Sequence, residues 1–404
     1  MRPPSRAASA LVLLLVGVLV GPASPVSAGT DFYDTGGLDA SGARGSVIRV
    51  EPMVAQVLPG VPIAAKAWRI LYRSTNATGA PVVVSGIVLV PEKPWKGTGP
   101  RPLVGYAMGT PGMKDSCAPS RKVATGTAYE ASLLASALNR GWALAITDYP
   151  GLGTPGGHQY VVGKALGPAV LDAMRAARDL PAAGLARHAP MAIYGYSEGG
   201  EAAGWALQLQ PTYAPDLDVR GGAVGAAPAD FEREATFIDK GAFAFLLGYV
   251  SMGFVAAYPE LAPDLERVLT PQGRAFLKAL DQTCVEDAIV VSQLWSHDSR
   301  TYLKVPPLGL PALRARLVEN NLGGVAPAVP VILGANRFDE VMVYNTSGPG
   351  LRDQWCRRGT PVRFVSSPLG DHIGGVFGFF PVAATFLSER LAGTPYRRPA
   401  DCPV

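Results

Sequence analysis

Short apolar segments alternate with longer amphipathic segments along most of the chain. The apolar segments are rich in Val, Ile and Ala and are bounded by Gly or Pro, which is typical of strands buried on both faces. We predict strands in seven segments, 81–91, 101–109, 142–150, 191–197, 219–229, 327–338 and 361–369.

Helical periodicity fills the intervals between several of these strands. We predict helices over 128–141 and 167–181 and a closing helix from about Phe377 to Leu391. In the segment 167–181 the apolar positions and the arginines fall on different stripes of a helix. Alternation of strands and helices predicts an α/β fold with a mostly parallel central sheet and helices on both faces.

The segment 231–324 breaks this alternation, because it contains only helical stretches and turns. Within it, residues 241–259 carry no charge. Their length would allow a membrane span, but two internal glycines and Ser251 favour a buried helix pair or a cap whose apolar face covers an active site. We therefore expect a helical cap or lid at 231–324, inserted between core segments 29–230 and 325–404.

The first 28 residues are typical of a secretory signal peptide. Arg2 and Arg6 precede an apolar core, and small residues precede a cleavage site near Ala28. The apolar core is too short and wrongly flanked for a stable membrane span. An uncleaved anchor is the alternative. We expect cleavage and a secreted, extracellular protein.

Charge and cysteine usage narrow the function classes. Removal of Arg2 and Arg6 lowers Lys+Arg from 36 to 34 against 32 Asp+Glu, so the mature net charge is close to +2. No basic cluster is interleaved with aromatic residues, which argues against nucleic-acid binding. The four cysteines, Cys117, Cys284, Cys356 and Cys402, lack C-x-x-C spacing and nearby histidines, which argues against a zinc site. In an oxidising compartment we expect two disulfides, with all three pairings open.

The sequence "YGYSEGG" places Ser197 between Gly195 and Gly199, after an apolar strand and before a helical segment. A sharp strand-to-helix turn exposes a serine hydroxyl and leaves little room for neighbouring side chains. The motif alone is weak in a glycine-rich chain, but its context favours Ser197 as a nucleophile. The backbone N–H of Glu198, at the start of the helix, is then a candidate oxyanion donor.

A serine nucleophile needs a histidine base, and the candidates are His158, His188, His297 and His372. His372 follows the last predicted strand and precedes the closing helix. Loops that follow parallel strands meet at the carboxyl edge of the sheet, where Ser197 would also lie. We therefore predict His372 as the base.

The carboxylate that orients the base should follow the serine and precede the histidine in enzymes with this type of turn. Asp339 and Glu340 lie directly after the strand predicted at 327–338. Asp371 is adjacent to His372, and neighbouring side chains diverge. We predict Asp339 as the acid, with Glu340 as the second choice.

A second oxyanion donor is expected in the loop "GTPG" after an early strand. Gly109, Thr110 and Gly112 have backbone N–H groups, whereas Pro111 has none. We place the donor at Thr110 or Gly112. A plain turn is the alternative, because this sequence favours turns in any protein.

Longer sequence blocks carry a family resemblance. They are "DFYD", "RILYRSTNATGAPVVVSGIVLVP", "GTPGMKDSCAPS", "TDYPGLGTPGGHQY", "GYSEGGEAA", "FDEVMVY", "QWCRRGTPVRF" and "GDHIGG". With these blocks the chain resembles the secretory lipase family of α/β-hydrolases over nearly all of its mature length. The resemblance implies an α/β-hydrolase fold with a helical cap at 231–324, and hydrolysis of carboxylic esters, often acylglycerols, without a metal or cofactor.

The resemblance also implies roles for individual residues. It places a Ser-Asp-His triad on Ser197, Asp339 and His372, and it implies that Cys117 pairs with Cys284, which leaves Cys356 with Cys402. Two features depart from the family pattern. Glu198 stands where many relatives carry glutamine, and the "GTPG" loop differs from its counterpart.

Other functions remain open at this point. The same triad could serve a secreted peptidase or an acyltransferase, although the apolar segment 241–259 does not suggest recognition of a charged peptide terminus. A non-catalytic, hydrolase-like binding protein is the third alternative. We expect a monomer that acts on a small-molecule or lipid ester, with transient lipid-interface contact through the cap.

Overall fold

The computed structural model describes residues 31–368 and 370–402. The predicted signal peptide, residues 1–28, lies outside this range. One compact unit begins at Tyr33 and continues to the end of the described chain, and the following description concerns this unit.

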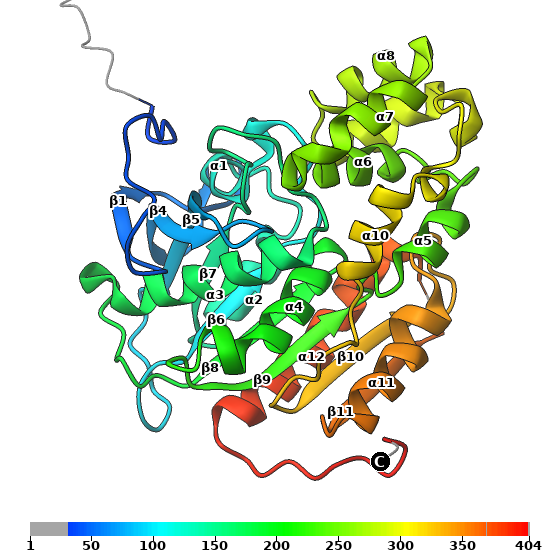
Figure 1. Ribbon diagram of the computed structural model, residues 1–404. Helices are drawn as coiled ribbons and strands as arrows, with labels where there is room; N and C mark the ends of the chain where they lie inside the picture. The colour runs from blue at the N-terminus through cyan, green and yellow to red at the C-terminus, as the bar shows by residue number, and fades with distance from the viewer. Residues whose placement is uncertain (1–30, 369, 403–404) are drawn as a thin grey trace, which may run out of the picture. The chain divides into compact units, whose positions relative to one another are not determined.

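A nine-stranded sheet forms the centre of the unit (Figure 1). Its strands are β1 (Val47–Met53), β4 (Ala65–Thr75), β5 (Pro81–Pro91), β6 (Leu103–Ala107), β7 (Ala143–Thr147), β8 (Met191–Tyr196), β9 (Val219–Gly225), β10 (Val331–Asn336) and β11 (Val362–Ser367). Their order is β1-β4-β5-β7-β6-β8-β9-β10-β11. The six strands from β7 to β11 in this order are parallel to one another.

Each of the seven predicted strand segments contains a strand of this sheet, and the prediction of an α/β fold with a mostly parallel sheet is confirmed. The antiparallel strands β1 and β4, and a separate hairpin of β2 (Gln56–Leu58) and β3 (Val61–Pro62), were not predicted. A tight turn joins β4 to β5. In this turn the side chain of Asn76 accepts hydrogen bonds from the backbone N–H groups of Thr78 and Ala80.

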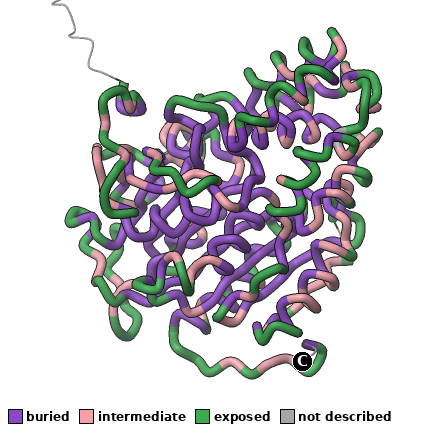
Figure 2. Tube along the Cα trace, in the orientation of Figure 1, coloured by how far each residue is buried: buried purple, intermediate pink, exposed green. Residues whose placement is uncertain are grey.

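Helices cover both faces of the sheet. On one face, in front in Figure 1, lie α3 (Gly163–Asp179) and α4 (Glu198–Tyr213), and α11 (Leu351–Arg357) extends this layer. The other face carries α1 (Pro119–Thr125), α2 (Ala131–Asn139) and α12 (His372–Leu391). Figure 2 shows the resulting sandwich as a buried centre with exposed residues along the outer helices.

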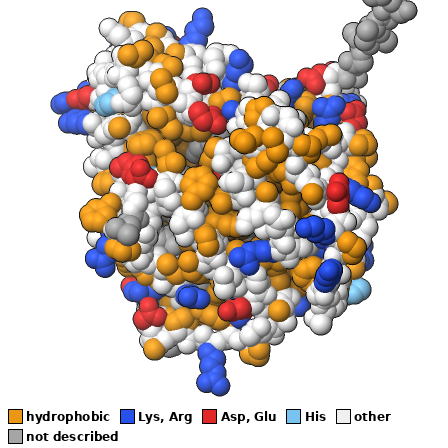
Figure 3. Space-filling view, turned by 180° about the vertical axis from the view of Figure 1, so that it is seen from behind, with side chains coloured by type: hydrophobic (Ala, Val, Ile, Leu, Met, Phe, Trp, Pro, Cys, Tyr) orange, Lys and Arg blue, Asp and Glu red, His pale blue; other side chains and the backbone are white. Residues whose placement is uncertain are grey.

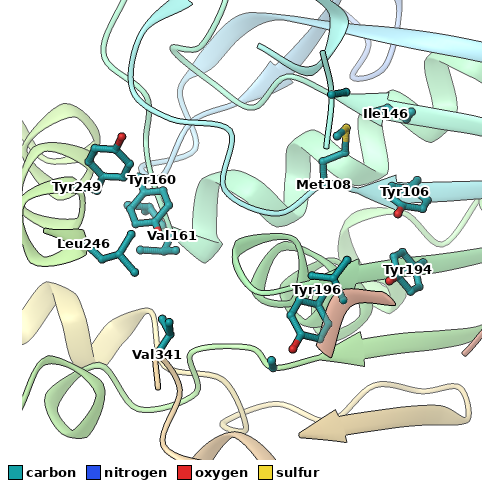
Figure 4. Close-up of a cluster of buried hydrophobic side chains, with 14 of the residues drawn as sticks. Tyr106, Met108, Ile146, Tyr160, Val161, Tyr194, Tyr196, Leu246, Tyr249 and Val341 are labelled. Atoms are coloured by element: carbon teal, nitrogen blue, oxygen red, sulfur yellow. The ribbon is translucent and has the colours of Figure 1, made fainter. Parts of the chain in front are cut away.

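Strand β8 shows how the sequence produces two apolar layers. All six of its residues are buried. Successive side chains alternate between the faces, so Ala192 and Tyr194 pack toward α2 and α12, while Met191 and Ile193 pack toward α3 and α4. Tyr194 also packs against Tyr106 of the neighbouring strand β6, with ring centroids 4.8 Å apart (Figure 4).

We refer to residues 231–324 as the cap segment. Its regular elements are helices, and six of them are α-helices, α5 (Phe231–Ile238), α6 (Leu246–Ala257), α7 (Ala262–Val268), α8 (Pro271–Leu280), α9 (Val285–Val291) and α10 (Pro311–Glu319). The uncharged stretch 241–259 therefore contains a 12-residue helix, α6, which buries Tyr249 and Phe254. Within the described part of the chain, no helix combines the length and apolar character of a membrane span.

Two disulfides are present. Cys117 is bonded to Cys284, which joins the loop after β6 to the cap segment across 167 residues of sequence. Cys356 of α11 is bonded to Cys402 near the C-terminus. These are the pairs that the family resemblance implies. The first is important for the site, because it fixes the cap segment to the loop that we considered for the second oxyanion donor.

Candidate active site

Ser197 lies at a sharp turn between β8 and α4. Its φ of 59° and ψ of −124° are unusual for a residue with a side chain. The turn brings backbones so close that a Cβ on Gly195 would lie 1.8 Å from the Gly199 carbonyl oxygen. A Cβ on Gly199 would lie 2.1 Å from the carbonyl oxygen of Ala107. Both glycines are therefore needed for the turn that presents the serine hydroxyl.

The structure brings the three predicted triad side chains together. Ser197 Oγ lies 2.8 Å from His372 Nε2, and His372 Nδ1 lies 2.9 Å from each carboxylate oxygen of Asp339. Asp339 and His372 are buried. Asp339 Oδ1 also accepts hydrogen bonds from the backbone N–H groups of Val341 and Met342, at 2.9 and 2.8 Å. These bonds fix the carboxylate in the orientation that faces the imidazole.

Two further residues hold the backbone of His372. Glu340 Oε2 accepts a hydrogen bond from the His372 N–H at 2.9 Å, so Glu340 contacts the histidine backbone instead of its ring. Tyr196 donates its hydroxyl to the His372 carbonyl at 2.9 Å. Burial raises the pKa of the Tyr196 phenol far above its usual value, so the hydroxyl keeps its proton. The residue before the nucleophile thus positions the histidine.

The closing helix begins five residues earlier than the sequence suggested, because α12 starts at His372 itself. Asp371 is the N-cap residue, and its side chain accepts a hydrogen bond from the Gly374 N–H at 2.6 Å. The glycines at 374 and 375 weaken the helical pattern in the sequence. Asp371 therefore caps α12, and the carboxylate that contacts the imidazole is that of Asp339.

The loop 108–113 is the structure's version of the "GTPG" turn. Thr110 lines the cavity that contains Ser197 and His372, whereas Gly112 is absent from that lining. Gly112 has a φ of 125° and forms an isolated bridge with Cys284 of the cap segment. Of the two candidates for the second oxyanion donor, the geometry therefore favours Thr110.

The sequence predicts a role only for the backbone N–H of Glu198, but in the structure its side chain is also part of the site. Glu198 is the first residue of α4, and its side chain is fully buried. Its Oε1 lies 3.0 Å from Nε2 of His158, which is also fully buried. One turn further along α4, Glu201 is buried as well. Burial is the main cause that raises the pKa of Glu201 well above its usual range, and electrostatic repulsion from Glu198 is the second. Two acidic residues in an otherwise apolar segment were the signal that the sequence offered for this cluster.

The other two histidines lie away from Ser197. His188 is exposed in the loop before β8, and His297 lines a small cavity within the cap segment. Among the residues that the structure describes, no group of three or more His, Cys, Asp or Glu side chains is placed to hold a metal ion.

An apolar cavity of about 190 Å³ opens at Ser197. Its lining comes from both the core and the cap segment and consists of Thr110, Tyr129, Ser197, Phe243, Phe245, Leu246, Val285, Glu286, Ile289, Val341, His372, Ile373, Val376 and Phe377. A second apolar cavity of about 50 Å³ shares Leu246 and Val341 with the first. Figure 4 shows these two side chains close to Tyr160 and Val161, which line the second cavity.

Comparison with known proteins assigns the family. Residues 118–398 match the family description "Secretory lipase". The chain belongs to the secretory lipase family. The family resemblance stated from the sequence is therefore confirmed, and membership makes the chain an ester-hydrolysing lipase, a carboxylic ester hydrolase.

Individual members of the family are distant relatives. A probable inactive lipase of Mycobacterium tuberculosis is 27% identical over 87% of this chain and 79% of its own length. A secreted triacylglycerol lipase of Malassezia furfur is 27% identical over 76% of this chain and 82% of its own length. The first of these is described as inactive, so the catalytic mechanism of this chain depends on the residues of its own site.

Solved structures confirm the fold. Candida antarctica lipase A in its closed state matches with a TM-score of 0.80 at 22% identity, over 90% of this chain and 85% of that one. A rice cell wall degrading esterase from Xanthomonas oryzae matches with a TM-score of 0.71 at 19% identity, over 88% of this chain and 100% of that one. The predicted α/β-hydrolase fold is therefore confirmed.

In this secretory lipase, Glu234 of α5 fastens the cap segment to the loop that follows Asp339. Its carboxyl oxygens accept hydrogen bonds from the Val343 N–H and from the hydroxyl groups of Thr346 and Ser347, at 2.7 to 3.1 Å. Burial raises the pKa of Glu234 to about 7, against the lowering effect of these hydrogen bonds. Glu234 is therefore protonated in the folded protein at mildly acidic pH.

A raised carboxyl pKa makes stability fall as pH rises. The pKa of Glu234 is 4.5 in the unfolded chain and about 7 in the folded protein, so between these pH values only the folded state binds the proton. The stabilisation that this proton gives to the folded state is complete below pH 4.5 and disappears as the pH rises past 7. Glu234→Gln is expected to gain about 2 to 3 kcal/mol of stability relative to the wild type between pH 5 and pH 8. Equilibrium urea unfolding at several pH values measures this difference.

Glu232→Gln is the matched control, because Glu232 lies on the same helix with a side chain that is 30% exposed. It makes the same chemical change on α5 at a side chain that does not bind the loop after Asp339. A stability difference between Glu234→Gln and the wild type that stays constant with pH would contradict the raised pKa of Glu234.

Proposed function

We propose that the protein hydrolyses carboxylic esters, acylglycerols among them, through an acyl-enzyme on Ser197. The observation that carries this proposal is the hydrogen-bonded chain Ser197–His372–Asp339, which ends in an apolar cavity. A nucleophile, a base and an orienting carboxylate at hydrogen-bond distances are the requirements of acyl transfer by serine.

In the first half of the proposed reaction, Ser197 Oγ attacks the ester carbonyl while His372 Nε2 takes the hydroxyl proton. Asp339 stabilises the imidazolium that forms. The backbone N–H groups of Glu198 and Thr110 hold the oxyanion of the tetrahedral intermediate. Collapse of this intermediate breaks the ester C–O bond, and His372 gives its proton to the leaving alcohol.

In the second half, water replaces the alcohol. His372 takes a proton from the water as the water oxygen attacks the acyl carbonyl of the acyl-enzyme. Collapse of the second tetrahedral intermediate returns the proton to Ser197 Oγ and releases the carboxylic acid. No further reactant is needed.

The lining of the cavity supports an apolar acyl group as the part of the substrate that is bound. Burying each CH₂ group of an acyl chain against such a surface contributes about 0.8 kcal/mol. The second cavity, which shares Leu246 and Val341 with the first, extends the apolar surface beneath the cap segment. An ester with an acyl chain of several carbons suits this surface better than a charged peptide terminus does.

Exposed apolar residues near the cavity support transient contact with a lipid interface. Ile373 and Phe377 line the cavity and are each 45% exposed, and Val290 and Leu294 follow the cavity-lining residue Ile289 on the cap side. Hydrophobic side chains gather in patches across the face seen in Figure 3, which is the side of the sheet that α12 covers.

We propose that the protein acts outside the cell, after cleavage near Ala28.

Hydrolysis of a panel of substrates tests the proposal. We expect release of fatty acid from tributyrin and from longer triglycerides, and no amine release from aminoacyl amides. A fluorophosphonate probe should label Ser197 stoichiometrically, because the probe reacts with activated serines. Labelling with amide cleavage but no ester cleavage would favour a peptidase, and an absence of labelling would favour a binding protein.

A further inference from the structure

His158 lies buried behind the candidate site, in the block "TDYPGLGTPGGHQY" (147–160). Its Nδ1 is 3.0 Å from the carbonyl oxygen of Gly112, and its Nε2 is 3.0 Å from Oε1 of Glu198. Gly112 belongs to the loop 108–113, and Glu198 directly follows the nucleophile. One imidazole therefore spans the two segments that supply the proposed oxyanion donors.

Two tyrosines of the same block join the imidazole in supporting the loop 108–113. The ring of Tyr149 stacks on His158 with centroids 5.9 Å apart, and the ring of Tyr160 meets it edge-on at 5.8 Å. Each of the three side chains contacts a different residue of the loop. Tyr149 donates its hydroxyl to the Met108 carbonyl oxygen at 2.7 Å, and the hydroxyls of Tyr160 and Thr110 are hydrogen-bonded at 3.1 Å. His158 contacts the Gly112 carbonyl oxygen. The packed rings thus contact every second residue of the loop, at positions 108, 110 and 112.

The partners of His158 determine how its protons are placed. A carbonyl oxygen can only accept, so Nδ1 carries a hydrogen and donates it to Gly112. Nε2 lies 3.0 Å from Glu198 Oε1, within ion-pair distance, but the two atoms do not have the geometry of a hydrogen bond. Both side chains are fully buried, so the two groups face each other instead of water. Removal of one partner would leave the other buried without compensation.

We propose that His158 is a positioning residue for the oxyanion site. Its imidazole, bound to Gly112 at one end and facing Glu198 at the other, sets the separation between the loop that carries Thr110 and the N-terminus of α4. This inference rests on the proposed function, because it assigns His158 a role in the same acyl transfer. His158 does not touch the substrate, and it acts through the two backbone donors.

Such a role has a specific kinetic signature. Oxyanion donors bind the tetrahedral transition state more strongly than the planar ester. A loosened site should therefore lower kcat and leave KM nearly unchanged, whereas a damaged substrate cavity should raise KM. The affinity for an alkyl boronic acid, which forms a tetrahedral anion on the serine, should fall together with kcat.

His158→Phe is the primary variant, because it keeps the ring between Tyr149 and Tyr160 and removes both polar contacts. We expect kcat for p-nitrophenyl butyrate to fall about 10- to 100-fold, with KM within about threefold of the wild type. The inhibition constant of butylboronic acid should rise by a similar factor. His188→Gln, at an exposed histidine outside the site, is the control and should leave all three quantities unchanged.

Glu198 variants separate a positioning role from a simple charge effect. Glu198→Gln removes the carboxyl charge and keeps a polar side chain of equal length, so His158→Phe should still lower kcat at least tenfold in that background. Glu198→Leu interrupts the same link at its other end. In the Glu198→Leu background, His158→Phe should change kcat less than about threefold, because the link is already broken.

Three results would overturn the inference. The first is an unchanged kcat in His158→Phe. The second is a fall in kcat in His158→Phe that is absent when Glu198→Gln is also present. The third is a raised KM with an unchanged kcat in His158→Phe. If His158→Phe does not fold, the kcat of Glu198→Leu is compared with that of Glu198→Gln, because Glu198→Leu interrupts the contact with His158 at the Glu198 side. Equal kcat values in these two variants would reject the positioning role of His158. The proposed function fails separately, by absence of ester hydrolysis and of fluorophosphonate labelling in the wild type.

Discussion

Ser197→Ala is expected to lower kcat for ester hydrolysis by about 10⁴-fold or more. The substitution removes the oxygen that would form the proposed acyl-enzyme, and it leaves His372 Nε2 without the hydroxyl to which it is hydrogen-bonded. In serine hydrolases these residues act as a unit, so the loss of the nucleophile removes nearly the whole contribution of the triad. Activity on p-nitrophenyl butyrate and on tributyrin is the measurement.

The protein should remain folded, because Ser197 Oγ is hydrogen-bonded to His372 and the alanine would inherit the same backbone turn. Thermal unfolding of the variant should therefore resemble that of the wild type. Ser41→Ala, at an exposed serine, is the matched control and should keep full activity. Retention of more than about 1% of the wild-type rate by purified Ser197→Ala, without fluorophosphonate labelling of a contaminant, would move the nucleophile elsewhere.

The parallel part of the fold could be predicted from sequence because its strands are buried on both faces. Such strands are continuous apolar runs, as in β8 and β10, and the runs are visible without knowledge of their neighbours. Strand β4 was missed for the opposite reason. Its residues alternate irregularly between buried and partly exposed positions, with Lys66, Arg69 and Arg73 among them. Its identity depends on pairing with β5, which the local sequence does not reveal.

The proximity of the three candidate catalytic side chains could be predicted from chain order and from the rule that loops after parallel strands share one edge. The structure places Ser197, Asp339 and His372 at hydrogen-bond distances, and it gives Glu340 a contact to the backbone of His372. The sequence favours Asp339 as the acid but leaves Glu340 as the second choice, because the two residues are adjacent. The backbone N–H groups of Val341 and Met342, which orient Asp339, are a property of the folded turn.

The contact between His158 and Glu198 could not be predicted from the local sequence, although Glu198 and Glu201 interrupt an otherwise apolar segment. His158 lies in a glycine-rich block, where a histidine gives no signal of burial, and its partners are distant in sequence. Acidic side chains are common at the start of a helix, so the position of Glu198 does not by itself predict burial. Its burial results from the packing of the segment 147–160 against the N-terminus of α4. The boundaries of the cap and of the signal peptide stay predictions.

Asp339→Asn is expected to lower kcat by about 10³- to 10⁴-fold. In the structure Oδ1 of Asp339 accepts the N–H groups of Val341 and Met342. An asparagine would turn its only oxygen toward these two donors, and its NH₂ group would then face His372 Nδ1. That arrangement makes Nδ1 an acceptor and places the ring hydrogen on Nε2. His372 could then no longer take the proton of Ser197.

Glu340→Gln is the matched control for this prediction. A glutamine oxygen can still accept the hydrogen bond from the His372 N–H that Glu340 accepts, so we expect kcat to fall by less than about tenfold. Steady-state kinetics on one soluble ester, with the rate of fluorophosphonate labelling measured in parallel, compares the two variants. Labelling of Asp339→Asn should slow together with hydrolysis, because both reactions need an activated serine. A larger loss in Glu340→Gln than in Asp339→Asn would transfer the role of the acid to Glu340.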